Sequence, residues 1–222
     1  MQSPFSCLPP VLNAIEQTLS PARLARFDES AEGNKHLALR LYVWNARLCE
    51  EFYLPLQLAE VAVRNAIHYT LTRRYGQNWF ENSSITSQLL DRYQRELQML
   101  VESLREKFRS GFSADRVVAG LTFGFWVNLL TARYENLLWQ QGLQRSFPHI
   151  ERSLGRRAAH AKIDQLRLFR NRVAHHYAIF DQSPTTEYRN IQEILSWVCP
   201  ETVWLMRELA NPARVIGARP RS

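Results

Sequence analysis

Apolar residues in this 222-residue chain recur at spacings of three and four, which is the period of an amphipathic α-helix. In the stretch 35–51, one such face is formed by Leu37, Leu41, Trp44 and Leu48. No stretch alternates apolar and polar residues between hairpin-turn signals, as a half-buried strand would. The sequence therefore predicts an all-α helical bundle with almost no sheet.

Start and stop signals divide this helical pattern. Ser20-Pro21 and Ser183-Pro184 each place an N-cap serine before a proline at the first helical position. Other expected features are a long helix from Ser84 or Thr86 to Phe108, a break between Gly120 and Gly124, a helix from Leu154 to Tyr177, and a new start or kink at Pro55. We expect an N-terminal helical extension (1–34), a helical domain (35–210) and a basic C-terminal tail (211–222).

The chain is strongly basic, with a net charge of +7 and a pI of about 9.7. Lysine occurs only at positions 35, 107 and 162, so 25 of the 28 basic residues are arginine. Guanidinium groups bind phosphate bidentately and stack on bases, so this bias favours a nucleic-acid partner. Codon preference in a GC-rich genome would give the same bias, and the sequence leaves both explanations open.

Several classes of protein are disfavoured by what the chain lacks. Its three cysteines, Cys7, Cys49 and Cys199, are far apart and form no Cys-x-x-Cys pair, which fits a reducing cytoplasm. The most apolar run, 117–130, is shorter than the roughly 20 residues of a membrane span. Carboxylates do not cluster as a two-metal site requires, and no nucleotide-binding glycine pattern occurs. We therefore expect a cytoplasmic protein without metal, cofactor or membrane partner.

One stretch carries candidate chemistry, Arg170-Asn171-Arg172-Val173-Ala174-His175-His176. On a helix, Asn171 and His175 lie one turn apart on one face, and Arg170 lies about 100° from Asn171. A fixed cation beside an imidazole suits a phosphodiester, because the guanidinium binds phosphate oxygens and the imidazole transfers protons near neutral pH. Basic residues at a helix C-terminus also simply complement the helix dipole, which is the structural alternative.

The run Leu168–His176 resembles the Arg-polar-His signature of the HEPN superfamily, and more narrowly the Arg-Asn-x-x-Ala-His-His motif of its Abi-like (abortive infection) branch. Two further stretches resemble segments of the same family and occur in the same order along the chain. Leu58–His68 is similar to the N-terminal helix of that family, and Leu121–Leu130 is similar to its middle Thr-Phe-Gly-Phe-Trp segment. The resemblance covers residues 37–204.

This resemblance implies a HEPN-like helical fold and a metal-independent endoribonuclease that cuts RNA through attack of its own 2′-hydroxyl. Arg170 would stabilise phosphoryl charge, Asn171 would orient the ring or touch the phosphate, and His175 would act as general acid or base, with His176 as the substitute. The reaction needs both an acid and a base, so the family's pairing of two signature helices implies a homodimer with a composite site. An anti-phage or toxin role, restrained by an antitoxin RNA or protein, is also implied.

Two groups of residues are candidate supports for this site. Glu60 and Arg64 share a helical line with His68 and would face the motif, or would form an ordinary intrahelical pair. The expected RNA-backbone contacts are Arg152, Arg156, Arg157 and Arg172; a solvated basic face is the alternative for the first three.

Two other functions remain open from the sequence. The chain would serve as a non-catalytic RNA-binding module if it recognises a structured noncoding RNA without cutting it. It would serve as a protein-interaction domain if the aromatic middle segment formed an oligomer core. We expect Phe123, Phe125, Trp126 and Trp139 to lie in the protein's own core rather than to stack on bases.

Overall fold

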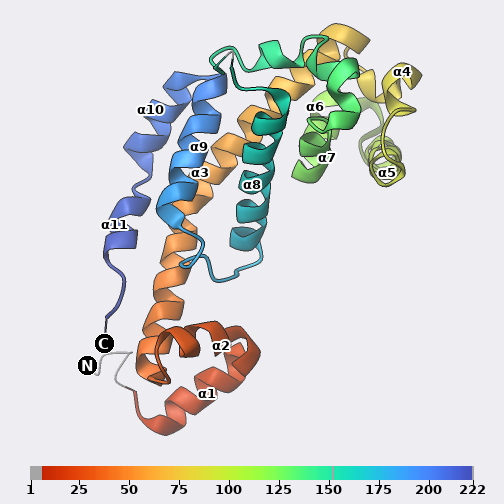
Figure 1. The fold of residues 1–222 in the computed structure, drawn as a ribbon. Coiled ribbons are helices and arrows are strands. Elements are labelled where there is room, and N and C mark those ends of the chain that lie inside the picture. Colours follow the sequence, from red (N-terminus) through yellow and green to blue (C-terminus); the bar gives the residue numbers. More distant parts are fainter. Residues whose placement is uncertain (1–6, 152, 222) are drawn as a thin grey trace. The chain divides into compact units, whose positions relative to one another are not determined.

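The computed structural model of the chain describes residues 7–151 and 153–221. This part of the chain contains helices and loops but no strand, so the predicted all-α class is confirmed. The α-helices, coloured along the chain in Figure 1, are α1 (Pro9–Leu19), α2 (Pro21–Ser30), α3 (Lys35–Tyr75), α4 (Ser83–Thr86), α5 (Asp91–Phe108), α6 (Ala114–Gly120), α7 (Phe123–Asn128), α8 (Arg156–Ala174), α9 (Pro184–Val198), α10 (Pro200–Leu209) and α11 (Pro212–Gly217).

Several expected boundaries are confirmed. Ser20 caps α2, because its hydroxyl accepts a hydrogen bond from the Arg23 amide at 3.3 Å. The chain breaks between α6 and α7, where the Thr122 hydroxyl accepts from the Phe125 amide at 3.3 Å. Helix α9 begins at Pro184, as the preceding serine indicates.

The structure decides one expectation about continuous helices and shows that another is wrong. Of the two alternatives for Pro55, a new helix start is excluded, since α3 continues from Lys35 to Tyr75 with Pro55 inside it. The helix expected from Ser84 or Thr86 is instead the single turn α4 followed by α5, with Leu90 in an extended conformation between them. At this break Arg133 Nε donates to the Gln88 carbonyl at 2.9 Å. This tertiary hydrogen bond satisfies a backbone carbonyl that would accept from a backbone amide in a continuous helix.

The chain forms two compact units whose segments alternate along the sequence. Unit 1 comprises Met1–Leu56, Phe169–Arg189 and Leu205–Ser222, and unit 2 comprises Gln57–Leu168 and Asn190–Trp204. The expected extension (1–34) and tail (211–222) therefore both fall within unit 1, and part of the expected tail forms helix α11.

Aromatic side chains fill the core of unit 1. Phe27 of α2 packs against Tyr42 of α3, with ring centroids 5.3 Å apart, and against Phe180, at 5.4 Å. Farther along α3, the buried Phe52 meets Phe169 of α8 edge-to-face at 5.0 Å. These contacts hold α2 and the segment that follows α8 against the first half of α3; Figure 1 shows α1 and α2 beside the beginning of that helix.

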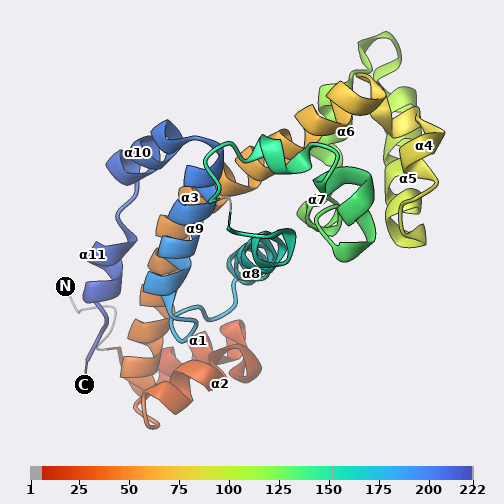
Figure 2. The ribbon, with the colours of Figure 1, turned by 45° about the horizontal axis from the view of Figure 1, so that its top comes forward.

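Unit 2 is organised around a second aromatic cluster. Trp79, which is fully buried, lies in a single turn after α3, with its ring 5.8 Å from Phe80, 6.2 Å from Phe125 and 5.8 Å from Trp126. Trp139 is also buried, so the middle-segment aromatics are core residues as expected. In the same unit, α5 and α6 pack side by side (Figure 2).

Two properties of the described residues bear on function. None of their helices combines the length and apolarity needed to cross a bilayer. Cys7, Cys49 and Cys199 are free thiols, and burial raises the pKa of the Cys49 thiol to about 11, so it is protonated at neutral pH.

Candidate functional site

Helix α8 ends just before the two histidines of the motif, three residues earlier than expected. The Tyr177 amide donates to the Arg172 carbonyl at 2.9 Å, and the His176 amide donates to the Val173 carbonyl at 3.1 Å. His176 has φ +59°, the left-handed conformation that terminates many helices. This pair of bonds is a Schellman motif, so His176 is the residue through which the chain turns away from the helix axis.

The catalytic candidates lie in unit 1 at the C-terminal end of α8, with Arg170 and Asn171 on the helix and His175 directly after it. Arg170 Nη1 donates to Asn171 Oδ1 at 3.4 Å, which places the guanidinium beside the amide. The His175 amide donates to the Asn171 carbonyl at 3.0 Å, so His175 keeps the helical register one turn beyond Asn171. The His175 side chain is exposed, with its ring centroid 6.3 Å from that of Tyr177. A cation, an amide and a solvent-accessible imidazole therefore share one helix end.

Arg23 of α2 contacts the same helix end and was not anticipated from the sequence. Its Nη1 donates to the His176 carbonyl at 2.8 Å and to the His175 carbonyl at 3.4 Å, and its guanidinium lies 5.9 Å from the Tyr177 ring centroid. A cation at this position satisfies terminal carbonyls and complements the negative end of the helix dipole. Arg23 therefore helps to hold the backbone that carries both histidines.

Asn45, a buried residue of α3, fixes the loop that follows the histidines. Its Oδ1 accepts a hydrogen bond from the Ile179 amide at 2.9 Å, and its Nδ2 donates to the Tyr177 carbonyl at 3.3 Å. The bond with Ile179 is buried, since Asn45 is 4% exposed and Ile179 is fully buried, whereas the bond with Tyr177 is partly buried. One side-chain amide thus replaces the partners that a helix would have given this backbone.

We expect Asn45→Ala to lower the free energy of unfolding by about 1–3 kcal/mol, because the buried Ile179 amide would lose its acceptor. Urea denaturation followed by circular dichroism measures the change. Asn65→Ala is the matched control, since Asn65 is a half-buried asparagine of α3 without a side-chain hydrogen bond among the described residues. Equal losses in the two variants would show that the Asn45 bonds contribute nothing specific.

The arginines expected to contact RNA differ in how the structure uses them. Arg156, whose side chain is 11% exposed, donates to the Leu130 carbonyl at 2.9 Å and to Glu135 Oε2 at 3.1 Å. These bonds tie the start of α8 to the preceding loop inside unit 2. The other expected contacts are Arg157, which is exposed, Arg172, which is half-buried, and Arg152, which lies outside the described residues. Contact between any of these four arginines and RNA stays a prediction.

Glu60, Arg64 and His68 belong to the part of α3 in unit 2, and all three are half-buried. Trp79 Nε1 donates to His68 Nδ1 at 3.1 Å. Burial lowers the pKa of His68 below its ordinary value; Asp115 opposes this shift and Arg64 adds to it. A neutral imidazole that accepts at Nδ1 is a packing group of unit 2, whereas the supporting role of Glu60 and Arg64 stays a prediction.

The described residues contain no group of three or more histidine, cysteine or acidic side chains able to hold a metal ion. Comparison with known protein families, curated proteins and solved structures finds no match to this chain. Function is therefore inferred from the residues at the end of α8 and from the net charge of the chain.

Proposed function

We propose that the protein is an endoribonuclease of the HEPN type that acts without a metal ion. The observation that carries the proposal is the end of α8, where Arg170 contacts Asn171 and the exposed His175 follows one turn later. The net charge of +7 supports a polyanionic substrate. The sequence resemblance to Abi-like proteins supports RNA rather than another phosphodiester.

In the proposed reaction the 2′-oxygen of one nucleotide attacks the adjacent phosphorus, and the bond from phosphorus to the 5′-oxygen breaks. A general base takes the proton of the 2′-hydroxyl, and a general acid protonates the departing 5′-oxygen. His175 performs one of these transfers. Arg170 stabilises the charge on the non-bridging oxygens, and Asn171 orients Arg170 through their contact. The products are a 2′,3′-cyclic phosphate and a 5′-hydroxyl.

One chain offers a single His175, whereas the reaction uses an acid and a base. We therefore propose that two copies of the chain pair their α8 ends, so that each contributes one imidazole to a composite site. In a bacterium such an enzyme would act as a phage-defence factor or as a toxin. Its restraint by an antitoxin RNA or protein is part of the same proposal.

The experiment that tests the proposal is digestion of a labelled RNA in excess EDTA, beside DNA of the same sequence. We expect RNA fragments that end in 2′,3′-cyclic phosphate and no cleavage of the DNA, because DNA lacks the attacking hydroxyl. Cleavage of both nucleic acids, or loss of RNA cleavage in EDTA, would contradict the mechanism. Tight, salt-sensitive RNA binding without product would favour the non-catalytic RNA-binding module instead.

A further inference from the structure

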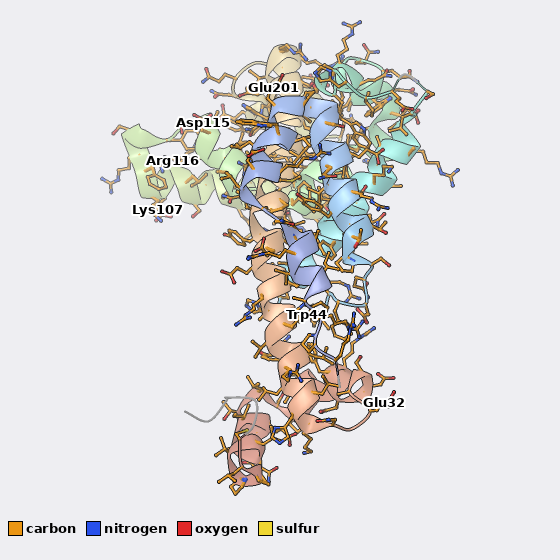
Figure 3. The ribbon with its side chains drawn as sticks, turned by 90° about the vertical axis from the view of Figure 1, so that its left-hand side faces the viewer. Glu32, Trp44, Lys107, Asp115, Arg116 and Glu201 are labelled. Atoms are coloured by element: carbon orange, nitrogen blue, oxygen red, sulfur yellow. The ribbon has the colours of Figure 1, made fainter. Side chains whose placement is uncertain are left out.

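A groove of about 550 Å³ runs between α3 and α11, entirely within unit 1. Its walls are fixed to each other. Trp44 Nε1 donates to the Val215 carbonyl at 2.6 Å, and Figure 3 labels Trp44 where the two helices meet. The Asn211 amide donates to Glu51 Oε2 at 3.1 Å, and Glu51 also pairs with Arg214 at 3.7 Å. The groove is therefore part of the folded unit and does not depend on a ligand to form.

Positive charge predominates along this groove. Arg40 and Arg47 of α3 are exposed, and Arg47 makes no ion pair or side-chain hydrogen bond among the described residues. Arg40 Nη1 donates to the Arg221 carbonyl at 3.3 Å, which leaves most of its donors unused. Of the two acidic lining residues, Glu51 is engaged within the wall, and Glu50 is exposed.

The chain after α11 adds two more arginines. The Arg219 guanidinium lies 5.8 Å from the Trp44 ring centroid and 5.5 Å from that of Phe180. Arg221 follows two residues later, where its carbonyl accepts from Arg40. The groove therefore has arginines on both walls and a single unengaged carboxylate. This arrangement suits phosphate groups, whose oxygens accept paired hydrogen bonds from a guanidinium group.

We infer that this groove binds the phosphate backbone of an RNA strand, apart from the site that cuts it. The inference rests on the proposed function, and it assigns a second substrate contact within the same unit. Arg40 and Arg47 lie seven residues apart, about 10 Å along α3 and within about 20° of one face. They are therefore placed to contact two phosphates of one strand.

The groove and the histidines lie on different sides of α3. Asn45, which holds the loop after His176, lies about 140° around the helix from Arg40. A helix with its side chains is about 10–12 Å across, so one strand must be several nucleotides long to reach both places. A very short RNA fills the cutting site alone, whereas a longer strand also engages the groove.

The test compares Arg40→Gln/Arg47→Gln with Arg95→Gln/Arg207→Gln, which removes the same charge from exposed helical positions outside the groove. Binding is measured by fluorescence anisotropy with a 20-nucleotide 2′-O-methyl RNA, which cannot be cut, over a series of salt concentrations. We expect the groove variant to bind about tenfold more weakly, with a salt dependence shallower by about 1.4 in log K against log[salt]. The control variant should bind nearly as wild type does.

Cleavage separates this inference from the proposed function. We expect the groove variant to cut a tetranucleotide at the wild-type rate and to lose about tenfold in kcat/KM on the 20-nucleotide RNA. Groove-dependent binding without any cleavage by wild type would refute the nuclease and leave the groove assignment intact. Equal weakening of binding in both double variants, or weakening in neither, would overturn the groove assignment. So would a groove variant that binds RNA normally but no longer binds poly-glutamate, since the ligand would then be an acidic protein.

Discussion

His175→Ala should reduce the rate of RNA cleavage by about 10²–10⁴-fold, because the proposed mechanism gives this side chain a proton transfer in the transition state. Arg170→Ala should cost about 10²–10³-fold, as the loss of one donor to a developing oxyanion typically does. Neither side chain is fully buried, so both variants should keep the wild-type circular dichroism spectrum. Initial rates on a labelled RNA, measured at substrate concentrations well below KM, give both values.

The neighbouring histidine supplies the matched control. His176 already has φ +59°, a conformation that glycine adopts without strain, so His176→Gly removes an imidazole while keeping the end of α8. We expect this variant to cut RNA within a fewfold of the wild-type rate. Wild-type cleavage by His175→Ala together with inactive His176→Gly would assign the proton transfer to His176.

Trp79→Ala should lower the free energy of unfolding by about 3–5 kcal/mol, the largest stability effect that we expect from one substitution. The side chain is fully buried among Phe80, Phe125 and Trp126, and its Nε1 donates to His68. Truncation would leave a cavity and would also remove the donor from a half-buried imidazole. Guanidinium denaturation followed by circular dichroism measures the loss.

Trp204→Ala is the control for this loss, because Trp204 belongs to the same unit but is 64% exposed. Its replacement should change the free energy of unfolding by less than about 0.5 kcal/mol. A comparable loss in both variants would mean that burial of Trp79 is not what stabilises unit 2.

Local patterns in the sequence were sufficient for the fold class and for many helix ends. Ser20-Pro21 marks the start of α2, and the glycines at 120 and 124 bracket the break before α7, because caps and breakers act over a few residues. The break before α5 was missed, since it contains neither glycine nor proline. There the Gln88 carbonyl accepts a hydrogen bond from Arg133, 45 residues away, a contact that local helix propensity does not register.

The candidate site could also be predicted only in part, because some of its contacts join residues that are far apart in the sequence. Arg170, Asn171 and His175 are close in sequence, so helical spacing alone relates them. Arg23 and Asn45 lie more than 130 residues before the backbone groups that they bind. No sequence feature near Arg23 or Asn45 indicates this role, and only the fold shows that these residues contact the end of the motif. The left-handed backbone at His176 was also missed, because histidine gives a weaker signal for it than glycine.

The two hydrogen bonds of Asn45 bear on how readily a substrate would be accepted. A catalytic loop that is free in solution must lose conformational entropy when it orders around its ligand, and that loss weakens binding. Here a buried amide already restricts the segment that leaves His175. The segment after the imidazole is therefore preorganised, and little of the binding energy of an RNA strand would be spent on ordering it.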